Sequence, residues 1–415
     1  MTIFRCAIAV CLFLVSASAP AIAEPLTLRD ALTRALHDNP ELAQYPFQQR
    51  IAEAAKLQAS LRPNPELSIE VENVLGTGKN RAFENLQTTL SFSQLIELGA
   101  KREQRIALAE AETQRVTAEF NYSKVEVLAE TTARYYHALK LQQLVDWYAQ
   151  QQQRLEHSFA LAQERVKLGA APAGEMLRVR LQQQRIAAEM SNAEGRLAEA
   201  RIHLSAMWAA MPDFNTLLGN FAEQPAVPGL AALDQAVNEA PELLRLFDSE
   251  RVLAAKLNAL EAAATADLTL GGGIRYSAAA DDLGFVLQAS IPWQLSNPQA
   301  GHLAANKAER DSLHLQQRKV RQELRARARV LQARAETDQR FLKQLQSQLI
   351  PTARELEQTT LAGYEDGIYS LLQVLDAQNE LASLEQEQLQ RQYAIYRSLL
   401  ELERLTGHTF VEASL

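Results

Sequence analysis

The chain has 415 residues, of which 47% are hydrophobic, 22% are charged and 6% are aromatic, and its formal net charge is −8. This composition is that of a folded protein and excludes a collagen-like or wholly disordered chain. The negative charge argues against binding to nucleic acid, and no apolar run approaches the roughly 18 to 20 residues that a membrane-spanning helix needs.

Residues 1–23 are predicted to be a cleaved secretion signal, because a short basic segment, an apolar core and small residues follow one another before Glu24. Both cysteines, Cys6 and Cys11, lie inside this segment, and neither follows the small-residue pattern of a lipoprotein cleavage site. We therefore expect the mature chain to leave the cytoplasm without a thiol, a disulfide or a lipid anchor.

Two pairs of short segments alternate apolar and polar residues, near residues 66–94 and 267–293. This alternation predicts strands with one wet face, each close to the roughly 9 to 11 residues that cross a bilayer at a tilt. If they cross a membrane, the polar side chains of Glu70, Glu72 and Arg275 face an aqueous lumen. An ordinary soluble sheet with one wet face remains the alternative.

Long stretches without glycine or proline, such as residues 100–168, predict helices far longer than the usual 11 to 12 or so residues. We expect helical hairpins over residues 100–210 and 300–407. A stripe of apolar residues with a 3.5-residue period, typical of coiled coils, runs through Ala138, Leu141, Val145, Tyr148, Leu155, Phe159, Ala162 and Val166. By themselves these helices also fit a periplasmic coiled-coil structural protein.

The chain contains an internal repeat with an offset near 200 residues. For example, Ala-Ala-Lys-Leu at residues 54–57 recurs at residues 254–257. This predicts two similar units, residues 24–225 and 226–415, each with a helix, a strand pair and a long helical hairpin.

Several short motifs give the mature chain a resemblance to a known family. They are Asn-Pro-Glu-Leu at 39–42, Arg-Pro-Asn-Pro-Glu-Leu-Ser at 62–68, Ser-Gln at 93–94 with Glu-Leu-Gly at 97–99 and Lys-Arg at 101–102, Gly-Tyr at 363–364 with Gly367, Leu-Asp-Ala-Gln at 375–378 and Leu-Glu-Arg-Leu-Thr-Gly at 402–407. With them the chain resembles the TolC-type outer-membrane efflux proteins. Within that family it looks most like the heavy-metal branch, whose members are CzcC-like proteins for cobalt, zinc and cadmium.

The resemblance implies a mainly α-helical fold with membrane β-structure. Three protomers of four strands each form a twelve-stranded barrel in the outer membrane of a Gram-negative bacterium, and long antiparallel coiled helices continue it as a periplasmic tunnel. The implied function is the exit duct of a three-component pump for heavy-metal cations such as cobalt, zinc or cadmium. Its implied partners are outer-membrane lipid, a periplasmic membrane-fusion adaptor and an inner-membrane RND antiporter.

The implied duct binds no nucleotide, catalyses no reaction and holds no cofactor. The seven histidines show no metal-ligand spacing, so no fixed metal site is expected either. The same channel serving multidrug efflux or type I secretion is the alternative function, and the periplasmic structural protein is the third.

The two helix-to-helix turns, residues 168–175 and 363–370, are expected to form the periplasmic tip. Glycines suited to positive φ and a capping box of Ser370 with Gln373 predict these turns, although any helical hairpin needs such residues. Apolar surface is expected at Val166, Leu168, Tyr364 and Ile368. By resemblance, the adaptor-contact candidates are Val166, Leu168, Gly169, Gly363, Gly367 and Ile368.

Four residues are candidates for a constriction at the tip: Asp376, Gln373, Glu175 and Tyr364. The resemblance places Asp376 in an acidic ring, in which three like charges repel one another or hold cations. It also places Tyr364 and Glu175 in polar links that latch the tip shut, whereas Tyr369 stands where some family members carry an arginine. The alternative is that Asp376 and Glu175 are ordinary solvated helix charges.

Overall fold

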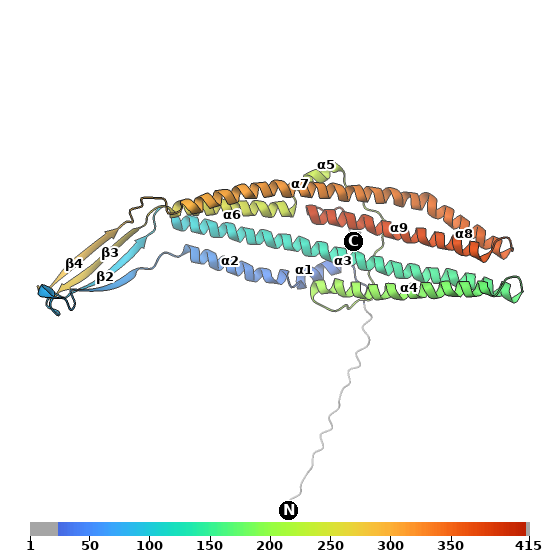
Figure 1. The fold of residues 1–415 in the computed structure, drawn as a ribbon, viewed down its shortest axis with the longest axis horizontal. Helices are drawn as coiled ribbons and strands as arrows, with labels where there is room; N and C mark the ends of the chain where they lie inside the picture. The colour runs from blue at the N-terminus through green and yellow to red at the C-terminus, as the bar shows by residue number, and fades with distance from the viewer. Residues whose placement is uncertain (1–23, 412–415) are drawn as a thin grey trace, which may run out of the picture.

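The structure is a computed structural model that describes residues 24–411. These residues form a long helical rod with a small antiparallel sheet at one end (Figure 1), which confirms the expectation of a mainly helical fold with a few strands. The predicted secretion signal lies outside the described residues. Among the helices of residues 24–411, none has the length and apolar character needed to span a membrane.

The α-helices range from 9 to 67 residues in length, and the strands from 7 to 10. In chain order they are α1 (Leu28–Asp38), α2 (Tyr45–Ser60), β1 (Glu66–Glu72), β2 (Gln87–Ile96), α3 (Lys101–Lys167), α4 (Gly174–Ser205), α5 (Leu230–Asn238), α6 (Pro241–Ala263), β3 (Leu268–Ser277), β4 (Asp282–Ser290), α7 (Ala300–Gln344), α8 (Ile350–Glu365) and α9 (Leu371–Thr406). Short 3₁₀ helices occupy Leu42–Gln44, Gly78–Asn80 and Ala206–Trp208, and a π-helical turn, Leu345–Leu349, joins α7 to α8.

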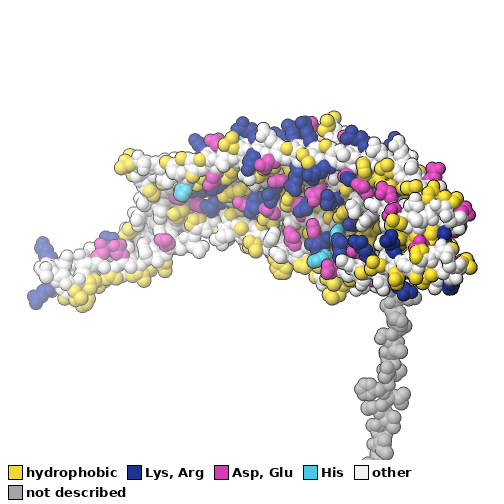
Figure 2. All heavy atoms as spheres, turned by 45° about the vertical axis from the view of Figure 1, so that its right-hand side comes forward, with side chains coloured by type: hydrophobic (Ala, Val, Ile, Leu, Met, Phe, Trp, Pro, Cys, Tyr) yellow, Lys and Arg dark blue, Asp and Glu magenta, His cyan; other side chains and the backbone are white. Residues whose placement is uncertain are grey.

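The four strands lie where the alternation predicts them and pair in the order β1-β2-β3-β4. The register places apolar residues of neighbouring strands in rows, of which one is Ile69, Leu90, Ile274 and Phe285. These side chains are exposed, Phe285 to 91%. Figure 2 shows hydrophobic side chains gathered along one side of the sheet. β1 and β4 are edge strands, so each leaves one row of backbone groups without a partner strand within residues 24–411.

The helices form one curved layer whose order is set by packing. α3 contacts α2 and α4 on one side and α6 and α9 on the other, while α7 and α8 cover α6 and α9 (Figure 1). The predicted apolar stripe of α3 lies at these contacts, since Ala138, Leu141, Tyr148, Leu155 and Ala162 are buried. The layer therefore has two free sides, one formed by α2 and α4 and the other by α7 and α8.

An aromatic cluster in the middle of the rod joins α3 to α9 and to the segment before α5. The ring centroids of Tyr136 and Tyr396 lie 5.1 Å apart, and that of Phe221 lies 5.1 Å from Tyr396 and 5.9 Å from Tyr136. Tilted and edge-on aromatic contacts of this kind add about 0.5–1.5 kcal/mol beyond the area they bury. They help to fix the register of the helices that carry the tip.

Candidate functional site

The polar face of the sheet carries all three residues expected on one wet surface. The register sets Glu70 opposite Thr89, and Thr89 opposite Arg275. The guanidinium of Arg275 lies 3.5 Å from a carboxylate oxygen of Glu72 and donates a 3.0 Å hydrogen bond to the hydroxyl of Thr89. One face of the sheet is therefore charged and hydrogen-bonded while the other is apolar and exposed.

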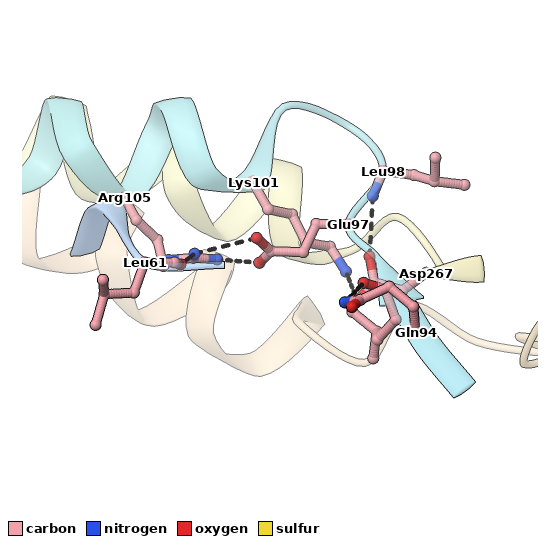
Figure 3. A network of polar contacts seen from close by, with 8 residues as sticks. Leu61, Gln94, Glu97, Leu98, Lys101, Arg105 and Asp267 are labelled. Carbon is pink, nitrogen blue, oxygen red and sulfur yellow. Dashed lines mark hydrogen bonds and ion pairs between the residues drawn. The ribbon is translucent and has the colours of Figure 1, made fainter. Parts of the chain in front are cut away.

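The junction between the sheet and the rod is held by two ion pairs (Figure 3). Lys101, at the start of α3, lies 2.7 Å from the carboxylate of Asp267, just before β3, and the backbone amide of Leu98 donates to the same carboxylate at 3.1 Å. Burial opposes ionisation of Asp267, but these two bonds prevail and hold its pKa below the usual value. Glu97 pairs with Arg105, which also donates to the backbone carbonyl of Leu61.

The turn from β2 into α3 explains the Glu-Leu-Gly motif at residues 97–99. Gly99 has φ +70°, and a Cβ atom there would lie 2.6 Å from the hydroxyl oxygen of Thr265. Both the positive φ and the close approach favour glycine. These motif residues thus set the angle between strand and helix, which fixes where the sheet points relative to the rod.

At the opposite end, the two predicted turns lie side by side (Figure 1). Gly169 (φ +71°) follows the end of α3, and Gly367 (φ +78°) follows the end of α8. Ser370 and Gln373 form the expected capping box at the start of α9. Leu168 and Ile368 are 76% and 73% exposed, so each turn presents an apolar side chain to the surroundings.

The expectation of an exposed Tyr364 is wrong, because this side chain is only 2% exposed. It packs in a small core with Leu371 and Val374 of α9. Its hydroxyl donates a 2.7 Å hydrogen bond to the carboxylate of Glu175 on α4. Burial, and then this bond to a carboxylate, raise the pKa of Tyr364 above its ordinary value.

Arg165, near the end of α3, completes this contact and is the residue that sequence reasoning missed. Its guanidinium carbon lies 4.5 Å from the centre of the Tyr364 ring, and it donates to the backbone carbonyl of Tyr364. Basic residues in the last turn of a helix are favoured by the helix dipole, so its position gave a weak signal. Arg165, Glu175 and Tyr364, here called the tip cluster, link α3, α4 and α8.

Two other tip candidates lie differently from expectation. Gly363 is buried, and a Cβ atom there would collide with the ring of Tyr369. Its predicted role as an adaptor contact therefore does not fit this arrangement, and its visible role is to admit that ring. Val166 is partly buried.

The acidic-ring candidates lie on α9, three residues apart. The side-chain oxygen of Gln373 accepts a 2.9 Å hydrogen bond from the backbone amide of Ser370, so it is engaged in the cap. Asp376 is exposed. Among residues 24–411, no group of three or more His, Cys, Asp or Glu side chains is arranged to hold a metal ion.

Known proteins share this fold. A relative in sequence is the cobalt-zinc-cadmium resistance protein CzcC of Cupriavidus metallidurans, 26% identical over 395 residues that cover 93% of this chain and 91% of CzcC. Solved structures of the outer-membrane channel OprN and of CusC each superpose with a TM-score of 0.74. OprN is 16% identical and covers 92% of this chain and 90% of its own, and CusC is 15% identical and covers 92% of each.

The same relationship is found at the level of a family. The model of the outer membrane efflux protein family matches twice, over residues 31–210 and 232–408. These two matches span nearly all of the described chain and confirm the resemblance that its motifs predict. The chain belongs to the outer membrane efflux protein family.

Proposed function

We propose that the chain is the outer-membrane exit duct of a tripartite RND efflux pump and that its cargo is heavy-metal cations. The observation that carries the proposal is the sheet, which has one apolar exposed face and one charged face. A sheet in a lipid bilayer needs this division, because apolar side chains face lipid while polar ones line a wet interior. A periplasmic coiled-coil protein would have no use for it.

The unpaired sheet edges support assembly into a ring. In lipid, every backbone hydrogen-bonding group must be satisfied, so β1 and β4 cannot both remain edges. Four strands are too few to close on themselves, whereas three copies supply twelve, above the about eight at which such barrels begin. In the proposed trimer, β4 of one copy pairs with β1 of the next.

The free sides of the helical layer fit the same ring. α2 leads directly into β1, and α7 follows β4, so strand pairing between copies brings α7 of one copy beside α2 of the next. α2 exposes a large apolar surface, with Ile51 70% and Leu57 65% exposed. The facing end of α7 exposes the small residues Ala304, Ala305 and Ala308, which allow close approach of a helix.

The tip supplies the proposed contact with the periplasmic adaptor. Leu168 and Ile368 are the exposed apolar side chains of the two turns, and we place Gly169, Gly367 and Val166 beside them in this surface. A charge at Leu168, as in Leu168→Glu, should prevent capture of the adaptor without unfolding the trimer. Normal co-purification of the adaptor with this variant would reject the contact.

Asp376 is the proposed cation-binding position of a constriction above the tip. Three exposed carboxylates in a closed ring repel one another and attract divalent cations. Asp376→Ala should therefore weaken block of the closed channel by divalent cations, with Asp366→Ala on the exposed turn as a matched control. Unchanged block in Asp376→Ala would refute this assignment.

The cargo proposal rests on the relative CzcC, whose name is that of a cobalt-zinc-cadmium resistance protein, and on the acidic residues of the polar sheet face. A deletion strain should become sensitive to cobalt, zinc or cadmium while its resistance to dyes and antibiotics stays unchanged. Sensitivity only to organic compounds would instead favour multidrug export through the same duct.

A further inference from the structure

A surface pocket lies at the junction of the sheet and the rod, beside the ion pairs of Figure 3. It has a volume of about 460 Å³, within the 300–1,000 Å³ or so that small-molecule sites occupy. Its lining is Arg62, Pro63, Gln94, Leu95, Ile96, Glu97, Arg102 and Glu103. It therefore combines two arginines and two carboxylates with two apolar side chains of β2.

The charges of this pocket fall into two groups. Glu97 is already paired with Arg105, and the adjacent Lys101 with Asp267. By contrast, Arg62, Arg102 and Glu103 take part in no ion pair or side-chain hydrogen bond within residues 24–411. Two cationic groups and one anionic group thus remain available to a ligand.

One of the two apolar side chains of the pocket, Ile96, continues the exposed apolar face of the sheet. Ile96 lies on the same side of β2 as Leu90 and Phe92, because side chains of a strand alternate, and it is 40% exposed. The connection from β4 to α7 returns to the same end of the rod (Figure 1) and carries Trp293, which is 90% exposed. Trp is favoured where an apolar layer meets water.

We propose that this pocket binds the head group of a membrane phospholipid, specifically a phosphoethanolamine head group. Arg62 and Arg102 hold the phosphate, for which guanidinium groups are suited, and Glu103 holds the ammonium group. The acyl chains then run along Ile96 and the apolar face of the sheet. This inference rests on the proposed function, because it needs the sheet to lie in a bilayer with the pocket at its periplasmic surface.

The test is native mass spectrometry of the full-length protein in detergent, titrated with phosphatidylethanolamine or phosphatidylglycerol. The double variant Arg62→Gln/Arg102→Gln should bind either lipid at least about tenfold more weakly, since each arginine supplies a charge-assisted contact. Glu103→Gln should lose the preference for phosphatidylethanolamine over phosphatidylglycerol. The control is Arg318→Gln/Arg327→Gln, which removes two exposed arginines of α7.

Lipid binding that is equal in the double variant and the control would overturn the proposal. Inorganic phosphate competing as strongly as the lipid would also overturn it, because the apolar wall would then contribute nothing. If the double variant misfolds, Arg62→Gln alone replaces it, because Arg62 is exposed. This single variant should show a smaller loss of lipid affinity than the double variant, and unchanged affinity would overturn the proposal. Membrane fractionation distinguishes failure of the proposed function from failure of the lipid site. If the protein is absent from the outer membrane, the proposed function is refuted. If it is present there and the double variant binds lipid as well as the control does, only the lipid site is refuted.

Discussion

Replacing Tyr364 by Phe removes one hydroxyl from the tip cluster and leaves the ring in place. The lost bond joins this hydroxyl to the Glu175 carboxylate at 2.7 Å, and hydrogen bonds to charged groups contribute about 1.5–3 kcal/mol. Glu175 is partly exposed, so water replaces part of the bond and we expect a loss of about 1–2 kcal/mol per protomer. This corresponds to a factor of about 5–30 in the opening equilibrium of the tip.

Amide hydrogen exchange measures this opening directly. In Tyr364→Phe, the amides of residues 363–370 should exchange faster by that factor, while those of the aromatic cluster in the middle of the rod stay protected. The matched control is Tyr369→Phe, since the hydroxyl of Tyr369 has no hydrogen-bond partner within residues 24–411 and its ring remains against Gly363. Equal exchange at the tip in both variants would refute the latch assigned to Tyr364 and Glu175.

Three further predictions concern the sheet, the tip core and pH. Gly273→Ala should lower the yield of folded protein, because its Cβ would lie 2.8 Å from the Cβ of Ser91. The control Gly284→Ala has open space around the new Cβ and should fold normally. Equal yields of the two variants, judged by the mobility of unheated samples on gels, would contradict this packing. Leu371→Ala should destabilise the buried tip core by about 2–5 kcal/mol and speed tip proteolysis far more than a change at the half-exposed Leu372. Because the pKa of Tyr364 is raised in the folded protein, the stability that its hydroxyl contributes to the tip is complete below pH about 10, the pKa of free tyrosine. That stability is lost as the pH rises further. The ratio of tip cleavage rates between Tyr364→Phe and the unmodified protein should therefore fall toward one above that pH, and a ratio that is constant with pH would count against this role.

Local signals predict the elements of this fold well. Gly99 and Gly169 both have positive φ and flank α3. The glycine-free stretch between them therefore predicts both ends of this helix to within one or two residues. The strands follow from alternation for the same reason, since a sheet with one wet face forces polar and apolar residues to alternate. Pro351 is an exception, because it does not end the helical run but lies in the first turn of α8, after a π-helical turn.

Contacts between distant parts of the chain could not be predicted in this way. Arg165 and Tyr364 are 199 positions apart, and no periodicity within α3 or α8 reveals that one covers the other. The burial of Tyr364 results from contacts of this kind with α3 and α4, so the local sequence pattern predicts its exposure wrongly. In the same way, the roles of Glu97 and Lys101 become clear only when Asp267 and Arg105 are placed around them.

The proposed duct is tested most directly by electrical recording, because copies of this chain are proposed to enclose a water-filled passage through a membrane. Purified full-length protein reconstituted in planar lipid bilayers should give stable, discrete current steps, and these should come from a trimer identified by mass in the same preparation. Folded protein that inserts into the bilayer and carries no current, under a range of voltages and pH values, would contradict the proposed duct.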